Sequence, residues 1–165
     1  MRLQELGYTI RKARLARGLT QAQLAQSASL SRTTMNQLEN GLFPDIGVRK
    51  AQTILEALGL DLHVRPAQRS RRPDFVRMAC ASASTSYREK LTEGELLRGL
   101  LTGRIPPGRR PHYRMLLDEA PVSLLKGMAE DVGKYVEPGR VSRNLAVIAE
   151  ALGSLRRLRG WLKSE

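Results

Sequence analysis

The chain has 165 residues, of which 41% are hydrophobic and 27% charged, so it is long enough for one or two small domains with buried cores. Aromatic residues make up only 4%, which predicts aliphatic, alanine-rich cores and favours an all-α fold. The formal net charge of +12 favours a polyanionic partner, with nucleic acid ahead of a membrane surface. The single cysteine, Cys80, excludes an intramolecular disulfide and a cysteine-based metal site within one chain.

Several classes of protein are not expected from this sequence. The first twelve residues lack the apolar core of a signal peptide, and no run is long enough to span a bilayer, so we expect a cytoplasmic protein without a membrane partner. No phosphate-binding glycine loop, zinc-protease motif or activated nucleophile is found, so we expect no enzyme activity. We also expect no metal and no other cofactor.

The first predicted element is an amphipathic helix in which Leu3, Leu6 and Ile10 recur at helical spacing. Gly18 can supply the left-handed position that ends this helix. Thr20 and Gln23 have the spacing of a capping box, which predicts that a second helix begins there. Both helices lie within a domain that we expect to cover residues 1–64.

A third helix is predicted from Arg32 to Glu39, with Ser31 as its N-cap. On a helical wheel its polar half carries Arg32, Thr33, Asn36 and Gln37 and no acid. Arginine can pair with guanine, and asparagine or glutamine with adenine, in the major groove of DNA. The alternative interpretation is an ordinary solvated helix face.

The segments TQAQLA and SRTTMNQLENG, within residues 20–41, resemble the helix-turn-helix of the Xre/Cro, or lambda-repressor-like, family. The resemblance extends from about Leu6 to Leu60 and implies a five-element DNA-binding domain. The positions at which that family contacts bases and nearby phosphates carry polar residues: Gln21, Ser31, Arg32, Thr33, Asn36, Gln37 and Asn40. Arg14 and Glu39 match a pair that forms an internal ion pair. Ser29 departs from the family, which usually has glycine in the turn, and a positive φ would strain it.

The strict alternation of Leu60-Asp61-Leu62-His63-Val64 predicts a short β-strand after a fourth helix. A lone strand needs a partner, and the same strand of a second subunit could supply it, so Leu60, Leu62 and Val64 are predicted dimerisation residues. The segment from ENG to LGLDLHV resembles HipB-type antitoxins, which implies a homodimer. His63 is expected to be exposed and not a metal ligand.

Residues 65–73, RPAQRSRRP, are predicted to form a basic linker without regular structure. This segment contributes four of the twelve net positive charges. It could be only a solvated connection, or a basic arm that contacts phosphates through Arg69, Arg71 and Arg72.

Residues 74–165 are predicted to form a second helical domain for partner binding or dimerisation. A firm helical stripe runs from Leu96 to Leu101, and Gly103 is expected to end that helix. Val141, Leu145, Ile148, Leu152 and Leu155 alternate steps of four and three, which indicates either a coiled-coil seam or the core face of a bundle helix. Gly153 is expected only to weaken this helix, and His112 is expected to be exposed.

These features lead to three functional hypotheses. The first is a sequence-specific repressor that binds a palindromic operator as a homodimer. In this hypothesis it is the antitoxin of a toxin–antitoxin pair, and it binds its toxin and autoregulates its operon. The second is a one-component regulator whose helical second half binds a small ligand. The third is a non-enzymatic assembly protein of a phage or mobile element, in which DNA contact is secondary.

Overall fold

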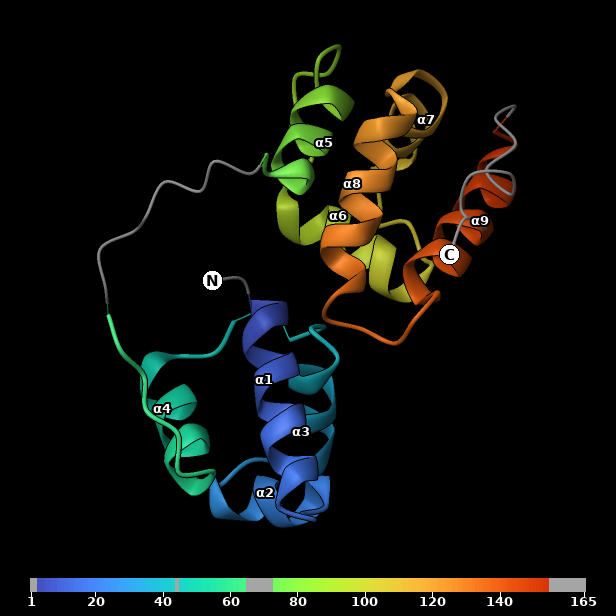
Figure 1. The fold of residues 1–165 in the computed structure, drawn as a ribbon. Helices are drawn as coiled ribbons and strands as arrows, with labels where there is room; N and C mark the ends of the chain where they lie inside the picture. The colour runs from blue at the N-terminus through green and yellow to red at the C-terminus, as the bar shows by residue number, and fades with distance from the viewer. Residues whose placement is uncertain (1–2, 44, 65–72, 155–165) are drawn as a thin grey trace. The chain divides into compact units, whose positions relative to one another are not determined.

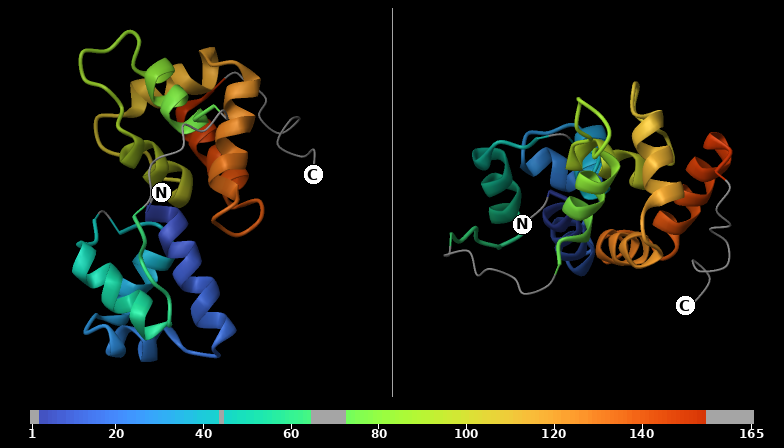
Figure 2. Two further views of the ribbon diagram at one scale, coloured as in Figure 1. Left: turned by 60° about the vertical axis from the view of Figure 1, so that its left-hand side comes forward. Right: turned by 90° about the horizontal axis from the view of Figure 1, so that it is seen from above.

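The computed structural model describes residues 3–43, 45–64 and 73–154, and it divides the chain into two compact units, residues 1–69 and 70–165 (Figure 1). All regular secondary structure in the described ranges is helical, which confirms the all-α expectation. Figure 2 gives two further views of the helices within each unit. The units are considered separately.

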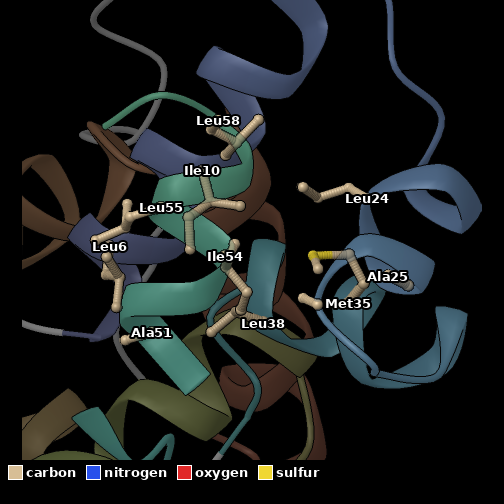
Figure 3. Packing of buried hydrophobic residues seen from close by; sticks show 11 residues of the cluster. Leu6, Ile10, Leu24, Ala25, Met35, Leu38, Ala51, Ile54, Leu55 and Leu58 are labelled. Carbon is tan, nitrogen blue, oxygen red and sulfur yellow. The ribbon is translucent and has the colours of Figure 1, made fainter. Parts of the chain in front are cut away.

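The first unit is a four-helix domain in which α3 packs against both α1 and α2, and α2 also contacts α4 (Figure 1). The helices are α1 (Leu3–Ala16), α2 (Gln21–Ser27), α3 (Arg32–Glu39) and α4 (Val48–Ala57). Their apolar faces meet in one aliphatic core, which includes Ile10, Leu24, Met35, Leu38 and Ile54 (Figure 3). Each of these five side chains is fully buried.

The capping residues of α2 and α3 are those that the sequence predicts. The Thr20 hydroxyl accepts a hydrogen bond from the Gln23 backbone N–H, and the Gln23 side chain accepts one from the Thr20 N–H, which completes the capping box. Ser31 accepts a hydrogen bond from the Thr34 N–H at 3.0 Å. Gly18 has a φ of 65° after the end of α1. These local bonds fix where the two helices of the motif begin.

Close packing of α1 on α3 depends on the absence of a side chain at Gly7. A Cβ atom there would lie 2.1 Å from the carbonyl oxygen of Leu38, well inside van der Waals contact. The opposing atoms belong to the backbone of α3, so they cannot rotate away as the end of a flexible side chain could. This contact sets the depth at which α3 sits against α1.

The predicted β-strand over residues 60–64 is not present: these residues have no regular secondary structure. A strand requires ladder hydrogen bonds to a neighbour, and the described part of this chain offers none. Leu60 instead belongs to the end of α4, since its N–H donates to the Leu55 carbonyl and its side chain packs on the core. Leu62 and Val64 are exposed, Val64 by 99%.

The second unit contains the other five helices of the described chain. These are α5 (Phe75–Ala83), α6 (Glu93–Thr102), α7 (Arg110–Glu119), α8 (Val122–Gly133) and α9 (Arg140–Leu152). Helix α5 contacts α6, α7 and α8, and α9 contacts α6, α7 and α8. The unit thus has its own core, with Leu96, Leu100, Leu116, Leu125 and Ile148 fully buried.

The structure of α9 differs from the sequence prediction at Gly153 and distinguishes between the two interpretations of its apolar stripe. Gly153 does not merely weaken the helix: it adopts a φ of 62° and ends it. Val141, Leu145, Ile148 and Leu152 are buried within the unit, so the stripe is the core face of a bundle helix and not a coiled-coil seam. Leu155 lies outside the described residues.

His112 is buried, contrary to the expectation of an exposed residue. It lies in the first turn of α7, where its Nε2 is 2.7 Å from the carbonyl oxygen of Glu89 and its ring is 4.4 Å from that of Tyr87. The loop between α5 and α6 covers it. A sequence pattern cannot show this cover because the covering residues are more than twenty positions away.

Two glycines of α6 provide a test of packing in the second unit. A Cβ at Gly99 would lie 2.0 Å from the buried Tyr113 hydroxyl, which donates to the Glu95 and Leu96 carbonyls. We expect Gly99→Ala to lower the free energy of unfolding of this unit by about 1–3 kcal/mol, because Tyr113 must move. Denaturant unfolding followed through the amide signals of α6 and α7 measures this.

Gly94→Ala is the matched control, because it is also in α6 and nothing lies within 4 Å of its added Cβ. It should be neutral or slightly stabilising, since alanine is the better helix former. Equal losses for the two variants would show that helix propensity, and not contact with Tyr113, limits this site.

Candidate nucleic-acid interface

An ion pair between Arg14 and Glu39 joins α1 to α3 at the centre of the first unit. Arg14 Nε is 2.6 Å from Glu39 Oε1, and Arg14 Nη2 is 2.9 Å from Oε2. The side chains are only 8% and 1% exposed. Arg14 Nη1 also donates to the Leu19 carbonyl at 2.7 Å. The bidentate pair thus fixes the start of α2 as well as the distance between α1 and α3.

Hydrogen bonding to Glu39 holds the pKa of Arg14 above its ordinary value, against the opposing effect of burial. Arg14 is therefore charged at any physiological pH. It is a scaffold residue, because its guanidinium points into the domain and not toward an external partner.

Gln21 connects this ion pair to the exposed face of α3. Its Nε2 donates to Glu39 Oε2 at 2.9 Å, and its Oε1 accepts from Asn36 Nδ2 at 3.4 Å. Asn40 Nδ2 donates to the Asn36 carbonyl at 2.8 Å and to Asn36 Oδ1 at 3.2 Å. Three predicted DNA-contact residues therefore form a continuous row of amides that begins at the buried ion pair.

The other predicted contact residues on α3 are arranged differently. Arg32, Thr33 and Gln37 are exposed, and their side chains make no hydrogen bond or ion pair within the described residues. Asn36 is also exposed, whereas Met35, Leu38 and Glu39 face inward. The helical wheel therefore divided α3 correctly. Arginine, threonine and glutamine remain available with all their donors and acceptors.

The electrostatic character of this face suits a phosphate-rich partner. From Thr20 to Leu38 the chain has no aspartate or glutamate, and Glu39 is buried against Arg14. The Ser31 hydroxyl caps α3 by accepting a hydrogen bond from the Thr34 N–H, so its first role is structural. The backbone N–H groups of α3 that precede the capped Thr34 N–H are suited to bind an anion.

The turn between α2 and α3 contains Ser29, which has a φ of 53° and is the one non-glycine residue with positive φ in the described ranges. The Leu30 N–H donates to the Ala25 carbonyl at 2.8 Å, which closes the turn. The motif thus keeps its turn with a residue that is strained there.

Arg69, Arg71 and Arg72, the predicted basic arm, lie outside the described residues. No group of three potential metal ligands occurs among the residues that are described. None of the described helices is long and apolar enough to cross a membrane.

Comparison with known proteins identifies the class of this domain. Residues 10–64 match the model of a helix-turn-helix family, and they form a helix-turn-helix domain of the Xre/Cro type. The match covers about a third of the chain and supports DNA binding and transcription regulation as the role of this domain. Neither the comparison with curated proteins nor that with solved structures gave a match.

The buried ion pair can be tested by removing one partner or both. We expect Arg14→Met and Glu39→Leu each to lower the free energy of unfolding of the first unit by about 3–5 kcal/mol, because each leaves a buried charge unpaired. The double variant should lose less than the sum of the two. Unfolding should be followed through amide signals of α1 and α3.

Lys12→Met is the control, since it removes a positive charge from an exposed position of the same helix. It should change stability by less than about 0.5 kcal/mol. Additive losses in the double variant would contradict a direct coupling between Arg14 and Glu39.

Proposed function

We propose that this chain is a sequence-specific transcriptional repressor that binds a palindromic operator as a homodimer and serves as the antitoxin of a toxin–antitoxin pair. The observation that carries the DNA-binding part is the exposed, acid-free face of α3. There the side chains of Arg32, Thr33 and Gln37 have no partner among the described residues, while Asn36 beside them is bonded to Gln21.

The two kinds of side chain suit two kinds of DNA contact. Base reading requires donors and acceptors that can adopt the geometry of a base edge, and Arg32 and Gln37 meet this need for guanine and adenine. The row formed by Gln21, Asn36 and Asn40 is already oriented by internal bonds. Such oriented amides suit phosphate oxygens, which position a protein without reading sequence.

In a homodimer each subunit would contribute its own α3, so two helices would contact bases. Leu62 and Val64 are apolar and exposed after the end of α4, so they could pair with the same segment of a second copy. Leu60 contributes only indirectly, because it packs on the core of its own domain. In dimers of this class the two recognition helices meet successive major grooves about 34 Å apart.

The antitoxin role is supported by the resemblance of the first domain to HipB-type proteins and by the presence of a second unit with its own core. In this proposal the second unit binds the toxin, and the complex represses its own operon. Co-expression with the product of the neighbouring gene tests it: two proteins that separate during purification would contradict the antitoxin role but not DNA binding.

Base reading predicts a specific loss of affinity. Arg32→Ala and Gln37→Ala should each weaken binding to the operator upstream of the gene by about 1–3 kcal/mol, while binding to a scrambled duplex stays nearly unchanged. Gel-shift titration of both duplexes at one salt concentration measures the difference.

Gln52→Ala provides the control for Gln37→Ala, because it removes the same amide from an exposed position of α4. It should leave both affinities unchanged. If Arg32→Ala and Gln37→Ala weakened operator and scrambled DNA equally, the base-reading role would be wrong.

The dimer hypothesis has its own test. A Leu62→Lys, Val64→Lys double variant should shift the chain from dimer to monomer in sedimentation equilibrium, because it places two cations on each side of the interface. Met78→Lys is the control, since it adds a cation at an exposed apolar residue of the second unit. A dimer that persists in the double variant would exclude this segment as the interface.

A further inference from the structure

The second unit has a groove of about 550 Å³ on one side of α7. Its floor and walls come from α7, from the end of α9 and from the loop after α5. The lining residues are Tyr87, Arg110, Pro111, Arg114, Met115, Asp118, Glu119 and Leu152. Grooves that hold small ligands fall in this size range and combine an apolar surface with a few oriented polar groups.

One end of the groove is cationic and held in place. Arg110 Nη2 donates to the Ala151 carbonyl at 2.8 Å, and Arg114 Nη2 donates to the Leu152 carbonyl. The two arginines are four residues apart on α7 and therefore about 6 Å apart along its axis. Each guanidinium has five N–H donors, so these bonds leave most of them available.

Each arginine uses one N–H group to cap the end of α9, and both arginines also line the groove. Guanidiniums bind carboxylates through paired, parallel hydrogen bonds. Because the α9 carbonyls already hold these side chains, less conformational freedom is lost when an anion binds.

The middle of the groove is apolar. Met115 is partly buried one residue after Arg114, and Leu152 is buried at the end of α9. Tyr87 also lines the groove, and it is held in place because its hydroxyl donates to the Pro111 carbonyl at 3.3 Å and its ring lies against His112. A hydrocarbon body that extends from the arginines would therefore meet side chains that are already positioned.

The far end of the groove is acidic. Asp118 follows Arg114 by one turn, and its carboxylate accepts a hydrogen bond from the Ser154 hydroxyl. Glu119 is exposed beside it. These carboxylates disfavour a second negative charge on the ligand, so a monocarboxylate fits better than a dicarboxylate or a polyphosphate.

We propose that this groove binds a small monocarboxylate with an apolar body. The carboxylate pairs with Arg110 and Arg114, and the body lies on Tyr87, Met115 and Leu152. This site lies within the second unit, and its ligand class is defined by charge order along α7. It does not depend on DNA binding by the first unit.

Titration of the full chain with octanoate tests the proposal. Octanamide and octylammonium serve as neutral and cationic compounds of the same length. Methyl signals of Met115 and Leu152 should shift and saturate with octanoate, with a dissociation constant on the order of 1 mM for so small a ligand. Octanamide should bind several-fold more weakly, and octylammonium more weakly than octanoate.

Two variants should change octanoate affinity in opposite directions. Arg110→Gln should weaken it about threefold to tenfold, because an arginine–carboxylate pair is lost at a partly solvated site. Asp118→Asn should strengthen it, because the repulsion at the far end falls. This second variant keeps the test decisive even if the first destabilises α9.

Arg140→Gln is the matched control. Arg140 Nε donates to the Leu101 carbonyl at 3.1 Å, so it also bonds a carbonyl at the end of a helix, but it does not line the groove. Octanoate affinity should be unchanged in this variant. The proposal would be overturned if octanamide bound as tightly as octanoate, if the Met115 and Leu152 signals did not shift, or if Arg110→Gln and Arg140→Gln had equal effects.

Discussion

The ion pair between Arg14 and Glu39 is the interaction on which the first unit depends. Removing two charges from water is costly, and that cost is offset only when their remaining donors and acceptors are bonded. Here the Leu19 carbonyl and the Gln21 amide supply those bonds. The pair and these bonds therefore link α1, the start of α2 and α3 in the observed arrangement. An apolar replacement could be as stable, but it would not orient Gln21, from which the amide row on α3 begins.

The same dependence shows which parts of the domain are predictable from sequence. Helix ends are local, so the Thr20–Gln23 capping box and the Ser31 cap follow from neighbouring residues alone. The inward and outward faces of α3 follow from its period. The hydrogen bond from Gln21 to Glu39 joins residues eighteen positions apart, so no local sequence pattern predicts it. Sequence therefore places the contact candidates on one face, whereas the structure separates those that are already bonded from those that are not.

The alternation at residues 60–64 led to a wrong prediction of a strand for a related reason. Alternating apolar residues indicate a pleated segment only where another strand can pair with it. In the described chain the Leu60 side chain and N–H both serve the end of α4. Leu62 and Val64 are exposed and do not belong to the core of the unit, so we propose that they contact a second copy of the chain.

Several arginines of the second unit join its helices through hydrogen bonds and ion pairs, a role that composition does not reveal. Arg110 and Arg114 bond the end of α9, Arg140 and Asn144 bond the end of α6, and Arg109 pairs with Glu95. Cations at helix C-termini are favourable because they face the negative end of the helix dipole. Cations in the two units therefore have different structural roles, which composition alone cannot separate. In the first unit the exposed face of α3 carries no acid, while the second unit uses cations to join its helices, and along α7 two of these arginines also line a groove.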